Sequence, residues 1–190
     1  MITVKTKLFS IDEYHRLIDL GVFTASDRIE LIKGQLVEMS PKGTAHSVSC
    51  SVLYRELSIL LGCIAALRCQ DPITLTDSEP EPDIIIARGR EADYLYRHPH
   101  PTDIVVAIEI SDSTLGYDRT TKLSLYAEHN ISNYWIVNLV DRQLESYSQP
   151  YEKPNGAYGY LNQQIYVADR SIQLPGIEGI LLELDRIFPR

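Results

Sequence analysis

Two acidic side chains interrupt apolar stretches of this sequence and are its strongest candidates for chemistry. Asp83 lies at the start of the apolar run in EPEPDIIIA (residues 79–87), and Glu109 lies near the end of IVVAIEIS (residues 104–111). Burying an unpaired carboxylate costs free energy comparable to the whole stability of a domain. A divalent cation satisfies two neighbouring carboxylates at once, so the pattern favours a metal site. Oxygen ligands of this kind suit Mg²⁺ or Mn²⁺.

The order of the two stretches predicts that their carboxylates meet. Residues 88–103 connect them, and if the two strands run antiparallel, the start of the first lies beside the end of the second. Asp83 and Glu109 are then neighbours. Because side chains alternate along a strand, Glu109 shares a face with Ala107 and Val105, and the small Ala107 leaves room beside the carboxylate. The opposite face takes the remaining apolar residues of that strand: Ile104, Val106, Ile108 and Ile110.

Composition narrows the class of protein. The chain has 190 residues and 44% hydrophobic content, which predicts one domain spanning residues 1–190 with its own core. Three cysteines without a CxxC pair indicate reduced thiols and a cytoplasmic protein. We see no signal peptide, and the longest apolar segment, residues 57–67, is too short to span a membrane. The net charge of −8 argues against a protein that coats nucleic acid non-specifically, but not against an enzyme that acts on it.

The remaining pattern predicts the elements that position these residues. Ser10 and Glu13 form a capping box for a short helix that ends near Gly21, and a β-hairpin follows at residues 28–41. Helical spacing of apolar residues predicts a second helix over residues 44–61.

Further elements are expected on both sides of the two acidic strands. A strand that carries Gln70 is predicted at residues 66–76, and a helix that carries Lys122 is predicted at residues 118–129. Later strands are expected at residues 133–140, 141–149 and 164–167.

Several polar residues also have ordinary structural explanations. Glu30, considered by itself, would be an exposed carboxylate on a strand of the predicted hairpin. Asp118 and Lys122, four residues apart on the predicted helix, would form a modest surface salt bridge. His46 and Cys50 have a spacing that metal sites use, but two ligands do not make a zinc site. A histidine near a helix start is more often a capping or surface residue than a ligand or proton-transfer group.

Taken together, the motifs resemble those of a known nuclease superfamily. A Pro-Asp at a strand start, a Glu at the end of the next strand and a Lys just beyond resemble the PD-(D/E)XK nucleases. More narrowly, the ordered series RIELIKGQLVEMSP, AHS, EPDIII, VVAIEIS and YDRTTKLSLYAEHNISNYWIV is similar to the Uma-two family of restriction-endonuclease-like proteins, over residues 9–140. The resemblance implies an α/β (mixed α+β) fold with a restriction-endonuclease-like core. Its central mixed β-sheet would be flanked by helices, with an N-terminal helix and β-hairpin added.

The resemblance also assigns roles to individual residues. It makes Asp83 and Glu109 metal ligands and the backbone carbonyl of Ile110 a candidate further ligand. The third place of the superfamily's Glu-x-Lys triplet holds Ser111 instead of lysine. In the family's pattern Lys122, on the following helix, takes the place of that lysine, and a helix packed across a sheet can present a long side chain over a strand end.

The implied activity is hydrolysis of phosphodiester bonds in DNA, with Mg²⁺ or Mn²⁺ as cofactor. Glu30 matches an early acidic position that helps to hold metal or water, and Lys122 would orient the attacking water or stabilise negative charge. Arg119, His46 and Gln70 are candidate substrate-binding residues. A homodimer is expected, because cutting two strands favours two sites and the apolar late strands can pair across subunits.

Other interpretations stay open at this point. Residues 88–100, rich in arginine, histidine and tyrosine, would either touch a nucleic-acid backbone or form an ordinary solvated loop. The fold could serve as a catalytically inactive binding or regulatory module. In a purely structural alternative, Asp83 caps a turn and Glu109 forms a buried ion pair with Lys122 or Arg119.

Overall fold

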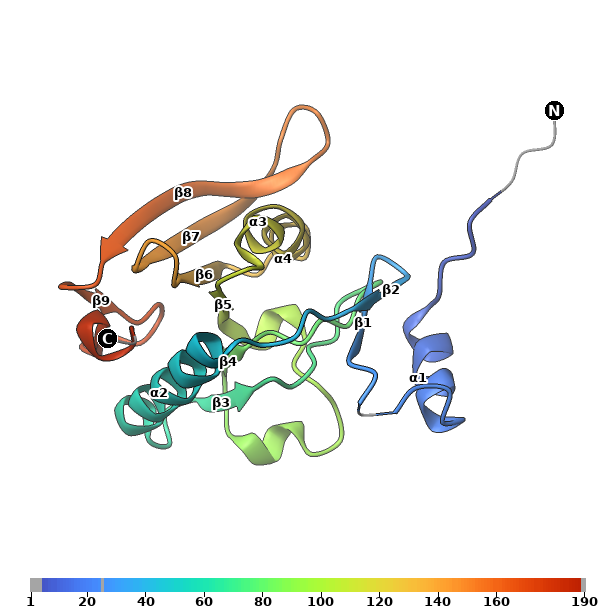
Figure 1. Ribbon diagram of the computed structural model, residues 1–190, viewed down its shortest axis with the longest axis horizontal. Helices are drawn as coiled ribbons and strands as arrows, with labels where there is room; N and C mark the ends of the chain where they lie inside the picture. Colours follow the sequence, from blue (N-terminus) through green and yellow to red (C-terminus); the bar gives the residue numbers. More distant parts are fainter. Residues whose placement is uncertain (1–4, 25, 189–190) are drawn as a thin grey trace.

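A six-stranded β-sheet forms the centre of the chain (Figure 1). The computed structural model describes residues 5–24 and 26–188. Strands β5 and β6 are parallel and the other neighbouring pairs are antiparallel, so the sheet is mixed, as expected. The strands lie in the order β3 (Ala66–Cys69), β4 (Ile84–Ala87), β5 (Ile104–Ser111), β6 (Asn133–Asn138), β7 (Gln143–Glu152) and β8 (Tyr158–Val167).

A helical crossover joins the two parallel strands. Parallel neighbours cannot be linked by a tight turn and need a long connection, commonly a helix. Here the connection consists of α3 (Leu115–Tyr117), a π-helical turn at Asp118–Lys122 and α4 (Leu123–Glu128). The helical segment therefore begins before the predicted residue 118.

Helices cover both faces of the sheet (Figure 1). Helix α2 (Thr44–Leu61), which has the predicted bounds, packs Leu53 and Leu57 on one face. Helix α4 packs Leu125 and Tyr126 on the other. The central strands are buried on both faces, which accounts for their unbroken apolar runs: the burial of β4 and β5 is complete along their length.

The N-terminal helix and hairpin form as predicted. Ser10 caps α1 (Ile11–Asp19), and its hydroxyl accepts from the Glu13 N–H while the Glu13 carboxylate accepts from the Ser10 N–H. Strands β1 (Ile29–Ile32) and β2 (Gln35–Glu38) pair antiparallel about a Lys-Gly turn. The hairpin is attached to the rest of the chain by a bridge between Leu31 and Glu79, just before β4.

The predicted alternation along β5 is correct at its end and wrong at its beginning. Val105 packs in the α2-side core with Val106, whereas Ile104 joins the opposite core with Ala107. The reason is a β-bulge: Ile86 pairs with Val106, but Ala87 pairs with Ile104, which leaves Val105 as an extra residue. Glu109 and Ala107, which lie beyond the bulge, keep the expected register.

Strand bounds differ from the sequence predictions at several places. The strand predicted at residues 66–76 ends at Cys69, and Gln70 follows it with a left-handed backbone, φ 56°. The strand predicted at residues 79–87 begins at Ile84, so Asp83 directly precedes it. The other elements are β9 (Ser171–Gln173), β10 (Leu181–Glu183) and 3₁₀ turns at Glu91–Tyr94, Pro101–Asp103 and Leu184–Arg186.

Two further expectations concern the chain as a whole. Among the described residues, no helix combines the length and the apolar character needed to cross a membrane. The assignment of residues 1–190 to a single domain stays a prediction.

Candidate active site

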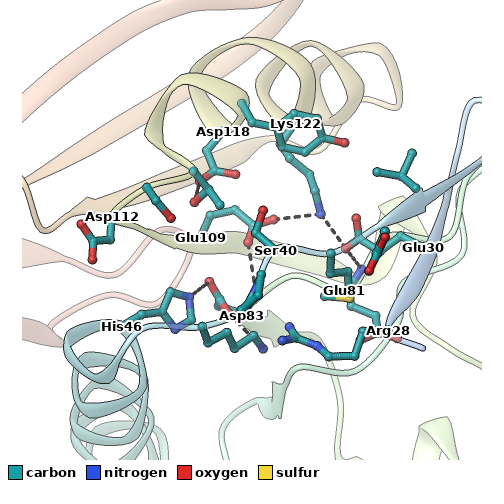
Figure 2. Close-up of a pocket in the computed structure, with 18 of the residues that line it drawn as sticks. Arg28, Glu30, Ser40, His46, Glu81, Asp83, Glu109, Asp112, Asp118 and Lys122 are labelled. Carbon is teal, nitrogen blue, oxygen red and sulfur yellow. Dashed lines mark hydrogen bonds and ion pairs between the residues drawn. The ribbon is translucent and has the colours of Figure 1, made fainter. Parts of the chain in front are cut away.

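A pocket lies where the hairpin, the start of α2, the end of β5 and the crossover helix meet (Figure 2). It encloses about 270 Å³. Its lining is rich in carboxylates, which makes it a site that attracts cations. The carboxylates on its wall belong to Glu30, Glu38, Glu81, Asp83, Glu109, Asp112 and Asp118, and the basic side chains are those of Arg28, Lys42, His46 and Lys122.

Asp83 is held at the edge of this pocket by the backbone of β5 and by α2. Its Oδ2 atom accepts a hydrogen bond from the Ile110 N–H at 2.9 Å and lies 2.9 Å from Nε2 of His46. The ammonium of Lys42 lies 3.7 Å from the other oxygen, Oδ1. The carboxylate is therefore fixed on one oxygen, and Oδ1 is the less engaged of the two.

Glu109 lies next to Asp83, as the antiparallel arrangement of β4 and β5 predicts. The Asp83 N–H donates to Glu109 Oε2 at 3.3 Å, and the Tyr126 hydroxyl donates to Oε1 at 2.6 Å. Burial raises the pKa of Glu109 to about 8; the charge of Lys122 opposes this rise and that of Asp83 adds to it. A cation placed beside Glu109 would stabilise its ionised form and so oppose the rise in its pKa.

Lys122 reaches the pocket from the last residue of the π-helical turn. Its Nζ atom donates to Glu30 Oε1 at 2.8 Å and lies 3.4 Å from Glu109 Oε1, with the side chain almost fully buried. Burial alone would lower the pKa of this amine, but the charges of Glu109 and Glu30 outweigh it, and the pKa is raised. Lys122 is accordingly a fixed positive charge, not a base.

Glu30 is not an exposed strand carboxylate, contrary to its ordinary explanation. Only 3% of the residue is exposed, and Oε1 also accepts from the Glu81 N–H at 2.8 Å. The hairpin carries it there, because Leu31, the next residue in β1, pairs with Glu79. Glu30 therefore connects the hairpin, the segment before β4 and Lys122.

The prediction of a surface salt bridge between Asp118 and Lys122 is also wrong. Both residues are buried, each only 4% exposed. Asp118 Oδ2 instead accepts from the Ser111 and Thr114 hydroxyls, each at 2.7 Å. Burial raises the pKa of Asp118. Ser111, at the triplet position where lysine is usual, thus anchors the first residue of the π-helical turn that carries Lys122.

The three candidate substrate-binding residues do not lie together in the structure. His46 lines the pocket, whereas Arg119 and Gln70 are not among its lining residues. Arg119 makes a two-pronged ion pair with the buried carboxylate of Glu145 on β7. The amide of Gln70 lies 3.7 Å from Sγ of Cys50. Their positions therefore give no support to a contact of Arg119 or Gln70 with substrate in this pocket.

The carbonyl of Ile110, the candidate backbone ligand, points toward the side of β5 on which Asp83 lies. Successive carbonyls of a strand point to opposite sides. The Ser111 carbonyl points toward β6, because it accepts from the Leu139 N–H. The Ile110 carbonyl therefore points toward the end of β4, where Asp83 lies.

Sequence reasoning gave no role to several residues that line the pocket or contact its carboxylates. Tyr126, one turn after Lys122, contacts Glu109 directly, and that spacing was a usable signal. Lys42 and Arg28 lie in irregular segments beside the hairpin, where no periodicity marks them.

The donor set fits a small divalent cation. Within the part of the chain that the structure describes, no group of three or more His, Cys, Asp or Glu side chains is arranged to hold a metal ion. Mg²⁺, however, is commonly bound by one or two carboxylates and keeps its other positions for water and substrate phosphate. Asp83, Glu109 and the Ile110 carbonyl are consistent with that pattern.

Comparison with known proteins gives the family. Among curated proteins none matches the sequence significantly. A solved structure described as "a putative nuclease belonging to DUF820" from Anabaena variabilis aligns with a TM-score of 0.71 and 15% identity, covering 95% of this chain and 97% of that one. At this identity the likeness shows the fold alone. The profile of the Uma2 family, described as "Putative restriction endonuclease", matches residues 11–185. This match spans the helix, the hairpin, the central sheet and all the pocket residues, and the chain therefore belongs to the Uma2 (Uma-two) family.

Proposed function

We propose that this chain is a metal-dependent endonuclease that hydrolyses phosphodiester bonds of DNA with Mg²⁺ or Mn²⁺. The observation that carries the proposal is the convergence of Asp83, Glu109 and Lys122, from three separate elements, on one pocket. The family's description as a restriction endonuclease favours DNA over RNA.

Three groups would hold the metal: the carboxylates of Asp83 and Glu109 and the carbonyl of Ile110. When bound, the metal supplies Lewis acidity that neutralises phosphate charge and acidifies a water molecule. The hydrogen bonds from Ile110 and His46 to Asp83 Oδ2 leave Oδ1 oriented for this purpose. Tyr126 orients Glu109 in the same way.

Lys122 provides the second positive charge of the site. Hydrolysis adds water across a P–O bond, and negative charge builds up on the phosphoryl oxygens as the water attacks. A buried, permanently protonated amine stabilises that charge more strongly than an exposed one, because the surroundings do not screen it. Glu30 holds the amine in place.

The phosphate backbone would approach over the basic residues at the rim of the pocket. Arg28 and Lys42 line it, and His46 lies beside Asp83. The carboxylates below them disfavour a phosphate until a cation is bound, so substrate binding should depend on the metal. A homodimer in the cytoplasm, with each chain forming a single domain over residues 1–190, completes the proposal.

One observation favours a second candidate, an inactive binding or regulatory module. Asp83 and Glu109 already have protein partners, including His46 and Lys122, so both carboxylates are hydrogen-bonded or ion-paired without a metal. This interpretation predicts no metal binding at the pocket.

Metal binding separates the two candidates. Calorimetric titration with Mn²⁺ should give heat for the wild type and none for Asp83→Ala, with Asp169→Ala as a control at an 81% exposed carboxylate. Equal heats for wild type and Asp83→Ala, or no heat from either, would remove the metal site.

Activity is tested with DNA and RNA substrates plus Mg²⁺, Mn²⁺ or a chelator. Cleavage of DNA should require the metal and be lost in Glu109→Ala, while Asp169→Ala remains active. The same residual cleavage in all three proteins would identify a contaminating nuclease and overturn the proposal.

A further inference from the structure

Strand β8 is an open edge of the central sheet. It is ten residues long and pairs with β7 on one side. No strand among the described residues pairs with its other side, where the sheet ends (Figure 1). Its outer backbone N–H and C=O groups are therefore available to another strand.

The edge lacks the features that normally prevent strands from pairing. Exposed edges are usually protected by charges, prolines or short length. From Tyr158 to Val167 the sequence YGYLNQQIYV contains no charged residue and no proline. Leu161, Ile165 and Val167 are 61%, 47% and 50% exposed. The opposite edge differs: β3 has four residues and carries Arg68.

The sequence of β8 is complementary to itself in one antiparallel register. If Gln163 of one copy lies opposite Gln163 of another, Leu161 lies opposite Ile165. The amide of Asn162 then faces that of Gln164. Each of these combinations is a favourable cross-strand pair, and each occurs twice about the two-fold axis.

We propose that β8 is the dimer interface of this protein, pairing antiparallel with β8 of a second copy about Gln163. The two central sheets then form one continuous sheet. None of the pocket residues lies on β6, β7 or β8, so both pockets stay open in such a dimer. The proposal names the surface for a homodimer and does not depend on nuclease activity.

The first test measures oligomeric state. Sedimentation velocity over a wide range of concentrations should show a dimer for the wild type and a monomer for Ile165→Lys, because two added lysines would face an apolar strand. Val140→Lys is the matched control, since Val140 is 60% exposed and lies outside β8. Far-UV circular dichroism confirms that the variants are folded. A monomeric wild type, or a dimer that survives Ile165→Lys, would overturn the proposal.

The second test reports the register. In a Cys63→Ser background, which removes the exposed thiol, Gln163→Cys places a cysteine opposite its own copy. The oxidant diamide should then form an intermolecular disulfide, taking two electrons and two protons from the two thiols as it is reduced to a hydrazine. Val167→Cys is the control on the same strand, because in this register it lies opposite Gly159. Efficient cross-linking through Val167→Cys but not Gln163→Cys would contradict the register.

Discussion

The side chains of Lys122 and Glu30 are 92 residues apart in the sequence and meet at 2.8 Å inside the pocket. This ion pair joins the N-terminal hairpin to the crossover helix. It also keeps the amine 3.4 Å from Glu109, where a lysine on β5 itself would otherwise be expected. The position of the Lys122 ammonium thus depends on an element far from the acidic strands.

Replacing Lys122 by methionine should lower kcat for DNA cleavage by about 100- to 1,000-fold, the usual effect of losing one charge-stabilising donor. KM should change less, because the amine acts on charge that develops during the reaction. Steady-state kinetics check this, with Lys7→Met as control at a 63% exposed side chain. Because the substitution leaves Glu30 and Glu109 without their cation, assays must be run below the melting temperature of the variant. An equal loss in the Lys7 variant would contradict the assignment.

Replacing Glu109 by glutamine should change how stability depends on pH. The pKa of Glu109 is raised by burial to about 8 from its ordinary 4.5, so the folded state binds its proton more tightly than the unfolded state. The resulting stabilisation is complete below about pH 4.5 and is lost as pH rises through about 8. Without metal, Glu109→Gln should therefore gain stability relative to wild type between pH 5 and pH 8, by an amount on the order of a few kcal/mol.

Urea unfolding in the presence of a chelator measures this difference. The comparison at each pH cancels the contributions of the other buried carboxyls, such as Asp118 and Glu81, whose pKa values are also raised. A constant difference between the two proteins from pH 5 to pH 8 would show that Glu109 keeps its charge through its pairing with Lys122.

Local sequence patterns were sufficient to predict much of the fold. The bounds of α2 follow from apolar residues at helical spacing, and the cap of α1 follows from Ser10 and Glu13. The proximity of Asp83 and Glu109 followed from strand direction alone. Asp83 precedes the first residue of β4 and Glu109 lies near the end of β5, and the β-bulge lies at the other end of this strand pair.

The remaining features depend on contacts that no local pattern contains. The burial of Glu30 requires the hairpin to dock against the segment before β4. Arg119 lies only three residues before Lys122, yet a carboxylate on β7 holds it away from the pocket lining. The bulge at Val105 arises from the register of two strands together, and alternation within one strand cannot reveal it.

Removing the hydroxyl of Ser111 should loosen the turn that carries Lys122. Ser111→Ala deprives the buried Asp118 carboxylate of one of its two hydroxyl partners, at a cost of about 1–3 kcal/mol in the free energy of unfolding. The Lys122 ammonium signal in ¹H–¹⁵N spectra should shift, because Asp118 begins the π-helical turn that ends at Lys122. Ser47→Ala is the control, since Ser47 is exposed and bonds only within α2 and its cap. Unchanged stability together with an unchanged ammonium signal would exclude this anchoring role.

Removing the imidazole of His46 should weaken metal binding without abolishing it. Nε2 of His46 lies 2.9 Å from Oδ2 of Asp83. A carboxylate oxygen can only accept, so the Nε2–H donates a hydrogen bond to Oδ2 and fixes the orientation of the carboxylate. Loss of such an orienting partner typically lowers metal affinity by about 10- to 100-fold. Mn²⁺ titration of His46→Ala should show this decrease, whereas His129→Ala, which removes a histidine with a similarly buried side chain outside the pocket, should keep wild-type affinity. Complete loss of binding in His46→Ala would make the imidazole itself a ligand, and unchanged affinity would mean that the Ile110 N–H alone is sufficient to orient Asp83.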